Sequence, residues 1–360
     1  APIPVHRAQA LCYARIYGEM EQLDKIVVQM TYANLDTEQI RRFREELSME
    51  YLVNWYQELT DAYHKWISYQ LRWKKERNRS MEGLEFPFPY REGQRKMVSS
   101  VYHSIVSEKQ IFIQAPTGVG KTMSTIFPAV RAVGEGKGET IFYLTAKTIT
   151  RTVAQEAFSI LRERGLRFKT ITIIAKEKMC FLEKAECNPE ACPYAKGHFD
   201  RVNEAVYQLW TTKENFDRDC ILEQAEKWKV CPFEMCLGLS VWMDGVICDY
   251  NYAFDPNVHL KRFFGEESRG KYIFLIDEAH NLAERGREMY SASICKEEVL
   301  EVKKRVKPFW PKLARALEKV NKLLLELKKE CDKYQIQENQ GVMPLYLMQV
   351  MGEMEQMLEE

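Results

Sequence analysis

A phosphate-binding loop is the feature that most restricts the fold of this chain. Residues 115–122 read Ala-Pro-Thr-Gly-Val-Gly-Lys-Thr and end in the Gly-Lys-Thr of a P-loop. Such a loop needs a strand before it and a helix after it, because the helix N-terminus and backbone N–H groups hold the phosphates. The run Gln110 to Gln114 predicts the strand, and Met123 to Val133 predicts the helix. The sequence therefore predicts an α/β nucleotide-binding domain.

The loop residues have separate expected roles. Lys121 can reach the β and γ phosphates, and the hydroxyl of Thr122 can ligate Mg²⁺. Ala115 replaces the usual first glycine without removing a phosphate-binding group. The residues expected to hold the nucleotide phosphates are Thr117, Gly118, Val119, Gly120, Lys121 and Thr122.

A second motif supplies carboxylates. Asp277-Glu278-Ala279-His280 follows the apolar run Tyr272 to Ile276, which predicts a strand. Asp277 is expected to hold Mg²⁺ through water, and Glu278 to orient and deprotonate the water that attacks the γ-phosphate. His280 is expected to couple nucleotide state to a neighbouring element. Together, and in this order, the two motifs indicate a nucleoside triphosphatase that uses ATP and Mg²⁺.

Composition limits the other classes. The 360 residues carry 52 Lys plus Arg and 52 Asp plus Glu, so any nucleic-acid binding must come from local basic patches. No apolar run approaches the ~18 residues that a membrane span needs, and no signal peptide stands at the start. We therefore expect a cytoplasmic protein with no membrane partner, long enough for two or more domains.

Four cysteines between the two motifs are candidate metal ligands. They are Cys180, Cys187, Cys192 and Cys231, separated by six, four and thirty-eight residues. These spacings do not match the paired knuckles of a zinc ribbon, whereas an iron–sulfur cluster tolerates them better. Spacing alone is equally compatible with buried free thiols. Cys220 and Cys236 lie close enough in sequence to replace one of the four ligands.

The order of these features resembles the XPD/DinG family of superfamily 2 iron–sulfur DNA helicases. The P-loop, the four cysteines, the string Asp-Tyr-Asn-Tyr-Ala-Phe-Asp-Pro at 249–256 and the Asp-Glu-Ala-His motif follow the family order. The resemblance covers roughly residues 86–360. It implies a RecA-like motor lobe, a 4Fe-4S cluster held by the four cysteines, and translocation from 5′ to 3′ along single-stranded DNA. It also implies that Gln94 reads the adenine base and that residues 143–148 contact the DNA backbone.

The expected organisation follows from this resemblance and from the composition. The motor lobe spans 81–175 and 237–295, the iron–sulfur domain 176–236, and the start of a helical arch domain 296–360. Helical periodicity over 313–325, after Pro308 and Pro311, agrees with the arch, although a coiled-coil tail is the alternative. Gly341 marks a later break.

Residues 1–80 resemble something else, the end of a RecB-type PD-(D/E)XK nuclease domain. Gln9 and Tyr13 lie at i and i+4 on one expected helical face, followed by a predicted strand over Lys25 to Tyr32 and a predicted helix from Thr37. An ordinary amphipathic helix explains the first segment equally well. The charged stretch 72–79 predicts the boundary to the motor.

The sequence therefore predicts the first motor lobe of an ATP-dependent DNA helicase, with a mostly helical N-terminal segment. The motifs of a second motor lobe do not follow, so we expect that lobe to be needed in cis. The alternative is a regulatory module that binds nucleotide, holds structural zinc on the cysteines and does not unwind DNA.

Overall fold

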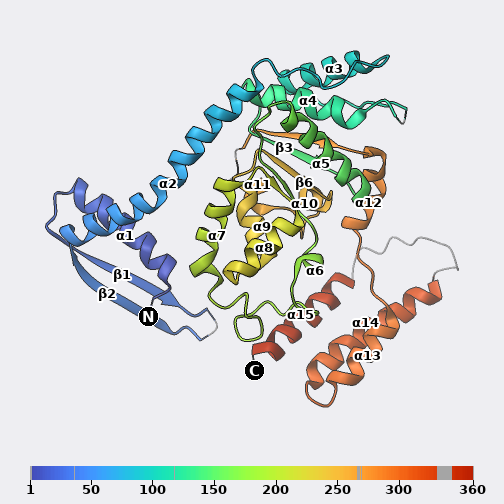
Figure 1. The fold of residues 1–360 in the computed structure, drawn as a ribbon. Coiled ribbons are helices and arrows are strands. Elements are labelled where there is room, and N and C mark those ends of the chain that lie inside the picture. The colour runs from blue at the N-terminus through green and yellow to red at the C-terminus, as the bar shows by residue number, and fades with distance from the viewer. Residues whose placement is uncertain are drawn as a thin grey trace. The chain divides into compact units, whose positions relative to one another are not determined.

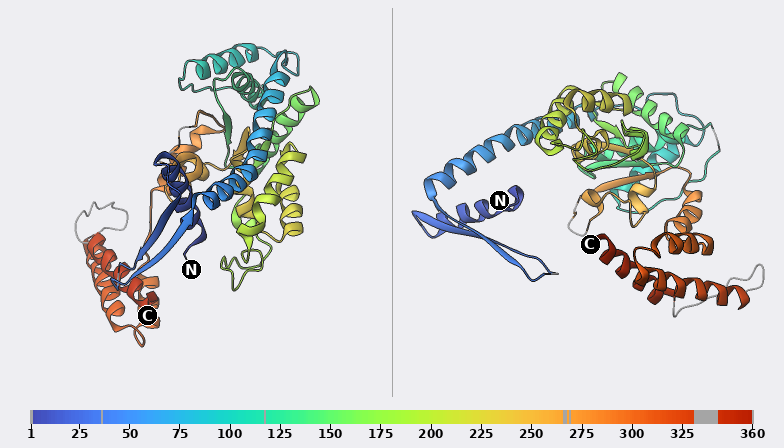
Figure 2. Two further views of the ribbon diagram at one scale, coloured as in Figure 1. Left: turned by 90° about the vertical axis from the view of Figure 1, so that its left-hand side faces the viewer. Right: turned by 90° about the horizontal axis from the view of Figure 1, so that it is seen from below.

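The computed structural model describes residues 2–35, 37–116, 118–265, 268, 270–330 and 343–359. These residues fall into two compact units, Ala1–Leu282 and Ala283–Glu360. Figures 1 and 2 show the ribbon from three directions. No helix within the described ranges has the length and apolar character needed to cross a bilayer.

A parallel sheet forms the centre of the first unit. Its five strands are β3 (Thr140–Leu144), β4 (Thr170–Thr172), β5 (Asn215–Phe216), β6 (Gly245–Cys248) and β7 (Tyr272–Ile276). They pair side by side in the order β5-β4-β6-β3-β7. Because β3 lies between two neighbours and beneath helices, all five of its residues are buried, as a run of β-branched and aromatic residues predicts. The expected α/β class is confirmed.

Helices on this sheet enclose the main core. They include α3 (Gln94–Val106), α4 (Lys121–Gly134) and α5 (Thr148–Glu163). Helix α4 begins within the P-loop and is buried along most of its length, which confirms the helix predicted after that loop. Phe158 of α5 stacks on Phe168 with ring centroids 5.5 Å apart, both within the apolar cluster that joins these helices to β3, β6 and β7.

The strand predicted over Gln110 to Gln114 is wrong. Residues 110–116 have no regular secondary structure, and the side chain of Phe112 is 87% exposed. A strand requires a neighbour that accepts and donates its backbone hydrogen bonds. Among the described residues, none of the five sheet strands pairs with this segment. We call residues 110–116 the lead-in segment.

The region with the four cysteines contains short helices around the sheet. They are α6 (Lys176–Met179), α7 (His198–Thr212), α8 (Arg218–Trp228) and α9 (Pro232–Ser240). Asp217 caps α8 by accepting a hydrogen bond from the backbone N–H of Cys220 at 2.9 Å. Trp210 and Phe216 are fully buried, and Phe216 belongs to β5. This region therefore shares its core with the sheet. The remaining elements before the unit boundary are α10 (Asn251–Phe254), α11 (Lys261–Phe264) and the 3₁₀ turn η1 (Ala279–Asn281).

The N-terminal elements are α1 (Pro4–Met20), the hairpin β1 (Lys25–Ala33) and β2 (Ile40–Ser48), and α2 (Met49–Met81). The strand expected from Lys25 is confirmed, but the helix expected from Thr37 is wrong. Residues 40–48 pair antiparallel with β1 over nine residues. Most of their exposed and half-buried positions alternate with the period of a strand. The helix begins only after Ser48, whose hydroxyl accepts a hydrogen bond from Tyr51 N–H.

Helix α2 runs without a break from the hairpin to the sheet (Figures 1 and 2). Its 33 residues correspond to about 50 Å. The charged stretch 72–79 lies inside this helix, where Trp73 and Arg77 are buried. The helix therefore ends in a polar network at the amino ends of β4 and β6.

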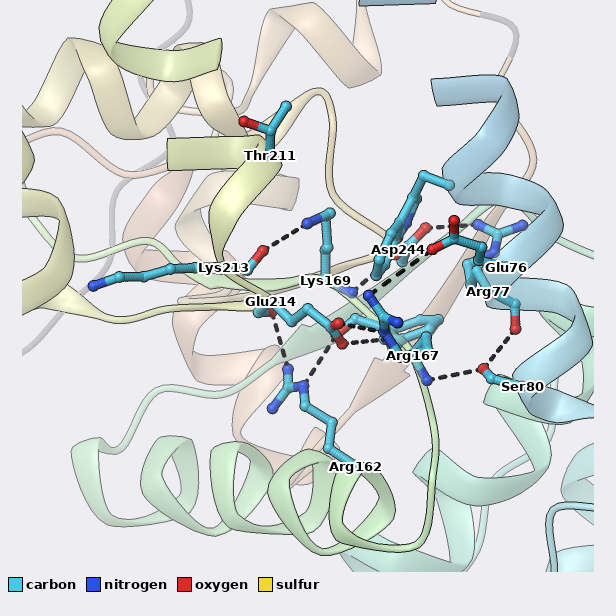
Figure 3. Close-up of polar contacts among 12 residues, drawn as sticks. Glu76, Arg77, Ser80, Arg162, Arg167, Lys169, Thr211, Lys213, Glu214 and Asp244 are labelled. Atoms are coloured by element: carbon cyan, nitrogen blue, oxygen red, sulfur yellow. Dashed lines mark hydrogen bonds and ion pairs between the residues drawn. The ribbon is translucent and has the colours of Figure 1, made fainter. Parts of the chain in front are cut away.

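This network, drawn in Figure 3, is centred on two residues that immediately precede strands. Asp244 precedes β6, and its carboxylate accepts hydrogen bonds from Arg77 Nη1 at 2.7 Å, from Trp73 Nε1 at 2.9 Å and from the backbone N–H of Lys169 at 2.9 Å. Lys169 precedes β4. We call this group the amino-end cluster; it comprises Trp73, Arg77, Arg162, Arg167, Lys169, Glu214 and Asp244.

The second unit is helical and has its own core. Its helices are α12 (Leu282–Met289), which starts at the unit boundary, α13 (Lys296–Val306), α14 (Pro311–Glu330) and α15 (Met343–Glu359). Leu313, Leu317 and Val320 of α14 pack with Val299 and Val350. The helical periodicity and the break at Pro308 and Pro311 are confirmed. Gly341 lies outside the described residues.

Candidate nucleotide-binding and hydrolysis site

The P-loop adopts a conformation that suits glycine. Gly118 and Gly120 have φ of 84° and 75°, in the left-handed region, and Gly120 is the N-cap of α4. A Cβ at Gly120 would also lie 2.8 Å from the side-chain nitrogen of Gln94. The loop therefore leads directly into a helix N-terminus, which favours a bound anion. Thr117 lies outside the described residues.

Lys121, the first residue of α4, brings a positive charge to the carboxylate motif. Its Nζ donates a hydrogen bond to the carbonyl of Ala115 at 3.2 Å. The helix that it begins contacts β7, the strand that leads to Asp277. The structure thus brings together residues that lie far apart in the sequence.

Asp277 and Glu278 follow β7 at the carboxyl edge of the sheet. The backbone N–H of Asp277 donates to the carbonyl of Leu144 at 3.0 Å, which ties the turn to β3. Burial, followed by the charge of Glu278, raises the pKa of Asp277 above its ordinary value. Glu278 has φ 51° and ψ 42°, a left-handed conformation that is uncommon for a residue with a side chain.

His280 lies at the solvent side of this turn. Its Nδ1 is 3.4 Å from a carboxylate oxygen of Glu278, and its side chain is 73% exposed. An exposed imidazole beside a carboxylate is placed to respond to an approaching element. The coupling role expected for His280 stays a prediction.

Gln94 packs against the P-loop. Its side-chain NH₂ donates to the carbonyl of Val119 at 3.0 Å, and its side-chain carbonyl accepts from Arg91 N–H at 3.0 Å. A cavity of about 420 Å³ lies beside it, bounded by the first turns of α3 and by the lead-in segment. Its size falls in the range of small-molecule sites. Tyr90 stacks on Phe86 nearby in sequence, with ring centroids 4.5 Å apart.

The expected DNA-contacting segment lies at the carboxyl end of β3. Thr145 is buried and shares a hydrogen bond with the hydroxyl of Thr150. Lys147 is exposed and is the N-cap of α5. An exposed lysine at a helix N-terminus suits a phosphate oxygen, so the geometry is compatible with the expected role.

The four candidate thiols are only partly gathered. Burial raises the pKa of Cys231, with a smaller contribution from Cys187, and Cys187 also raises the pKa of Lys176. Cys192 is buried, whereas Cys180 is half-buried at the end of α6. Within the described ranges, no group of three or more His, Cys, Asp or Glu side chains converges as a metal site. The four thiols are suitable ligands for an iron–sulfur cluster, but the structure does not arrange them around a common centre.

Two residues of the site were not assigned to it from the sequence. Tyr143 precedes the last residue of β3, and Tyr250 follows β6 by two residues; both are buried. The Tyr250 hydroxyl donates a hydrogen bond to the Asp277 carbonyl, and Tyr143 lies on β3, which pairs with β7 just before this turn. A polar group at the end of an otherwise apolar strand is the sequence signal that could have identified them.

Comparison with known protein families finds two matches in this part of the chain. Residues 91–187 match the model for the DEAD/DEAH box helicase family, and residues 167–299 match the DEAD_2 family. The two matches together contain the P-loop segment, the four cysteines and the Asp-Glu-Ala-His motif.

Curated relatives are helicases by name. The chain is 25% identical over 203 residues to a probable ATP-dependent helicase of Methanocaldococcus jannaschii, covering 55% of this chain and 29% of that protein. It is 25% identical over 196 residues to the ATP-dependent DNA helicase XPD of Sulfolobus acidocaldarius, covering 53% and 33%. The chain therefore spans about a third of the length of these relatives.

Solved structures of an XPD helicase and of a truncated XPD also match. Their TM-scores are 0.45 and 0.44, each with 18% sequence identity. The alignments cover 74% and 72% of this chain, and 48% and 76% of the respective structures. The two sequence-family matches, to the DEAD/DEAH box helicase and DEAD_2 models, together span residues 91–299 of this chain.

Proposed function

We propose that this chain is the first motor lobe of an ATP-dependent DNA helicase and contributes most of one face of its ATP site. The supporting observation is that the P-loop leads into the N-terminus of α4, and this helix contacts β7, the strand that Asp277 follows. Open parallel sheets bind ligands at this edge, and phosphate, Mg²⁺ and attacking water need these residue types in close proximity.

The proposed roles follow from the chemistry of each side chain. Lys121 binds the terminal phosphates, and the backbone N–H groups of 118–122 cradle them. Thr122 and Asp277 hold Mg²⁺, the latter through water. Glu278 orients the attacking water and takes its proton. Gln94 reads the adenine, for which its amide must exchange the contact with Val119 for one with the base.

Lys121→Ala and Glu278→Gln test this assignment as a pair. Lys121→Ala should weaken nucleotide binding by the chain and abolish turnover by the native polypeptide that contains it, because the charge on the terminal phosphates is lost. Glu278→Gln keeps the metal site and removes the base. Its nucleotide affinity should stay within about twofold while hydrolysis falls roughly 10²–10⁴-fold. Calorimetric titration and phosphate release provide the two measurements. Unchanged turnover in Lys121→Ala would refute the P-loop assignment.

We further propose movement from 5′ to 3′ along single-stranded DNA, with the backbone gripped by residues 143–148, and a second motor lobe supplied in cis. The names of the relatives support a role in DNA unwinding, and the exposed Lys147 at the start of α5 supports contact with the DNA backbone. Unwinding of duplexes that carry either a 5′ or a 3′ single-stranded tail distinguishes the polarity. Preference for the 3′ tail would contradict the proposal.

We also propose that Cys180, Cys187, Cys192 and Cys231 hold a 4Fe-4S cluster. The support is a four-thiol donor set and the proximity of Cys187 to Cys231. Bound there, a cluster would supply a covalent cross-link between segment 180–192 and the N-terminus of α9. In this arrangement Lys176 offers its positive charge to thiolate sulfur.

Anaerobic purification followed by iron and sulfide analysis tests the cluster. About four irons per chain are expected. Cys192→Ser should bleach the visible absorption and leave nucleotide binding in place. Cys220→Ser is the matched control: this thiol is buried on α8, burial raises its pKa, and it should keep the full iron content. One zinc and no iron would instead favour the structural-zinc module, and iron loss in Cys220→Ser would change the ligand set.

For the N-terminal elements we propose the tail of a nuclease-like domain, with the second unit as the start of a helical arch. In α1 the side-chain nitrogen of Gln9 donates to the Tyr13 hydroxyl at 3.3 Å, so the pair expected on one helical face is in contact. The native polypeptide should then show metal-dependent DNA cleavage that Gln9→Ala lowers. Cleavage indifferent to that substitution would leave α1 as an ordinary amphipathic helix.

A further inference from the structure

A basic hollow lies where α7 begins and α8 ends, and it contains none of the residues given a role above. Its volume is about 710 Å³, and its lining includes Pro193, Lys196, Arg201, Lys227, Trp228 and Lys229. Four of these side chains are cationic, and no carboxylate is among the described residues that line it. The volume is in the range of sites that hold a ligand the size of a nucleotide.

Arg201 sets the shape of this hollow. Its Nε donates to the carbonyl of Trp228 at 3.0 Å, and its Nη2 donates to the carbonyls of Lys196 at 2.8 Å and Lys229 at 2.6 Å. The guanidinium therefore ties the segment before α7 to the end of α8. A Cβ on Gly197 would lie 2.6 Å from Arg201 Nη1, so glycine permits this close approach. Contacts within the chain thus form the hollow in advance of any ligand.

Two of the lysines keep their charge available to a ligand. Lys196 is exposed, and its ammonium has no hydrogen-bond or ion-pair partner among the described residues. Lys227 is also exposed, and its Nζ donates to a neutral amide oxygen at 3.3 Å. Two carboxylates belong to the same segments: Glu226 pairs with Lys229, and Asp200 lies in the first turn of α7. Four cations against two carboxylates leave an excess of positive charge, which favours an anionic ligand.

Trp228 adds an aromatic side chain to the same surface. It is half-buried, and its Nε1 donates to the side-chain carbonyl of Gln208 at 3.0 Å, which fixes the ring. Proteins bind single-stranded nucleic acid by combining a positively charged groove with aromatic side chains on which unpaired bases stack. Bases inside a duplex are already stacked on their neighbours. The hollow therefore suits a single strand better than a duplex.

We propose that the basic hollow is a second contact site for single-stranded DNA, additional to residues 143–148. Lys196 and Lys227 bind backbone phosphates, and Trp228 stacks on one base. Arg201 is a positioning residue that holds the two lysine-bearing segments together. This inference rests on the proposed function for the identity of the partner. It involves no ATP hydrolysis, so binding is measured without nucleotide.

Anisotropy of a labelled single-stranded oligonucleotide, titrated with the native polypeptide at several salt concentrations, tests the phosphate contacts. Each contact to a single strand contributes about 0.7 to the slope of log affinity against log salt. Lys196→Gln and Lys227→Gln should each lower that slope by about 0.7, and lower affinity about fivefold at ~0.1 M salt. Lys213→Gln is the matched control, because this exposed lysine lies at the other end of α7.

Trp228→Leu tests the stacking contact separately. It should lower affinity by about tenfold and leave the salt slope unchanged, because the loss of stacking changes no phosphate contact. Trp228→Phe keeps an aromatic ring and should retain most of the affinity. A blunt duplex of the same sequence should be bound equally by the native polypeptide and by both Trp228 variants.

The outcomes separate this inference from the function on which it rests. If Lys147→Gln weakens binding but Lys196→Gln and Lys227→Gln match Lys213→Gln, the hollow is not a DNA site and the contact at 143–148 stands. If the two hollow variants weaken binding and Lys147→Gln does not, the hollow is supported and the contact at 143–148 fails. Losses by the Trp228 variants that are equal on the duplex would overturn the assignment to single strands. Affinity losses that only follow a fall in thermal stability would overturn the site itself.

Discussion

The two ends of the same parallel strands hold polar clusters of opposite character. At the amino ends, Asp244 and Lys169 are buried, and the polar atoms of both side chains are bonded within the chain. At the carboxyl ends, Asp277 is half-buried, burial and the charge of Glu278 raise its pKa, and Glu278 has a strained backbone. Both clusters contain a lysine near an aspartate, so composition does not distinguish them.

The difference lies in how completely each cluster satisfies its own charges. A buried charge is tolerable when its hydrogen bonds are made within the protein, and a cluster in that state has little left for a ligand. A cluster with adjacent carboxylates and a strained turn stores unfavourable energy that a cation and a phosphate can relieve. We therefore interpret the amino-end cluster as a structural anchor for α2 and the carboxyl-end residues as the functional site.

The largest expected effect comes from breaking the anchor. Asp244→Ala leaves Arg77 buried without its carboxylate and should lower the free energy of unfolding by about 3–5 kcal/mol. Nucleotide affinity of the remaining folded protein should be unchanged, because the proposed nucleotide site lies at the opposite strand ends. Chemical denaturation and titration of the folded fraction measure the two quantities.

Asp277→Ala is the matched control at the other strand ends. It removes one of two adjacent carboxylates, so unfolding free energy should stay the same or rise while Mg²⁺-dependent hydrolysis is lost. Equal destabilisation by the two aspartate variants would abolish the distinction between anchor and site.

A smaller effect should depend on pH. Lys169 is 1% exposed, and burial lowers its pKa to about 8 from an ordinary 10.5, although its Nζ donates to the carbonyls of Trp210 at 2.7 Å and Lys213 at 2.6 Å. Between pH 8 and 10.5 the unfolded chain binds more protons at this residue than the folded chain. The contribution of Lys169 to stability should therefore rise with pH through that window and be constant below it.

The substitution Lys169→Met tests this pH dependence of stability directly. The stability difference between the native protein and the variant should favour the native protein by roughly 1–2 kcal/mol more at pH 9.5 than at pH 7. A flat profile for Lys169→Met would mean that Lys169 stays charged within the anchor.

The sequence was sufficient for features that depend on local pattern. The helix after the P-loop and the strand at 272–276 were predicted correctly because each has a clear residue period and adjoins a recognisable motif. The two nucleotide-site motifs were recognised from their own residues and from their order in the chain. The roles of the individual site residues remain predictions.

The features that could not be predicted from the sequence depend on contacts between distant segments. The anchor joins α2 to residues about 90 and 170 positions later in the chain, at Lys169 and Asp244. The strand at 40–48 was missed because its residues favour a helix about as much as a strand, and only its pairing with β1 decides between them. Tyr250 looks like an ordinary buried aromatic residue until the turn that it contacts is in place.

The smallest expected effect concerns the lead-in segment. Gln110-Ile-Phe-Ile-Gln114 and Tyr272-Ile-Phe-Leu-Ile276 are similar five-residue runs, and each precedes a nucleotide-site motif. The second run pairs with β3 through all five residues, and the first has no pairing partner among the described residues. Strand formation therefore followed the available hydrogen-bonding neighbour rather than the local residue pattern.

Phe112→Ser tests that explanation. Phe112 is 87% exposed, so replacing it should change the free energy of unfolding of the chain by less than about 0.5 kcal/mol. Phe142, at the matching position of the buried strand β3, is the contrasting control. Phe142→Ser removes a fully buried ring and should cost about 3–5 kcal/mol. A loss above about 1 kcal/mol for Phe112→Ser would show that the lead-in segment is packed in solution, and that the residue pattern alone had predicted its strand correctly.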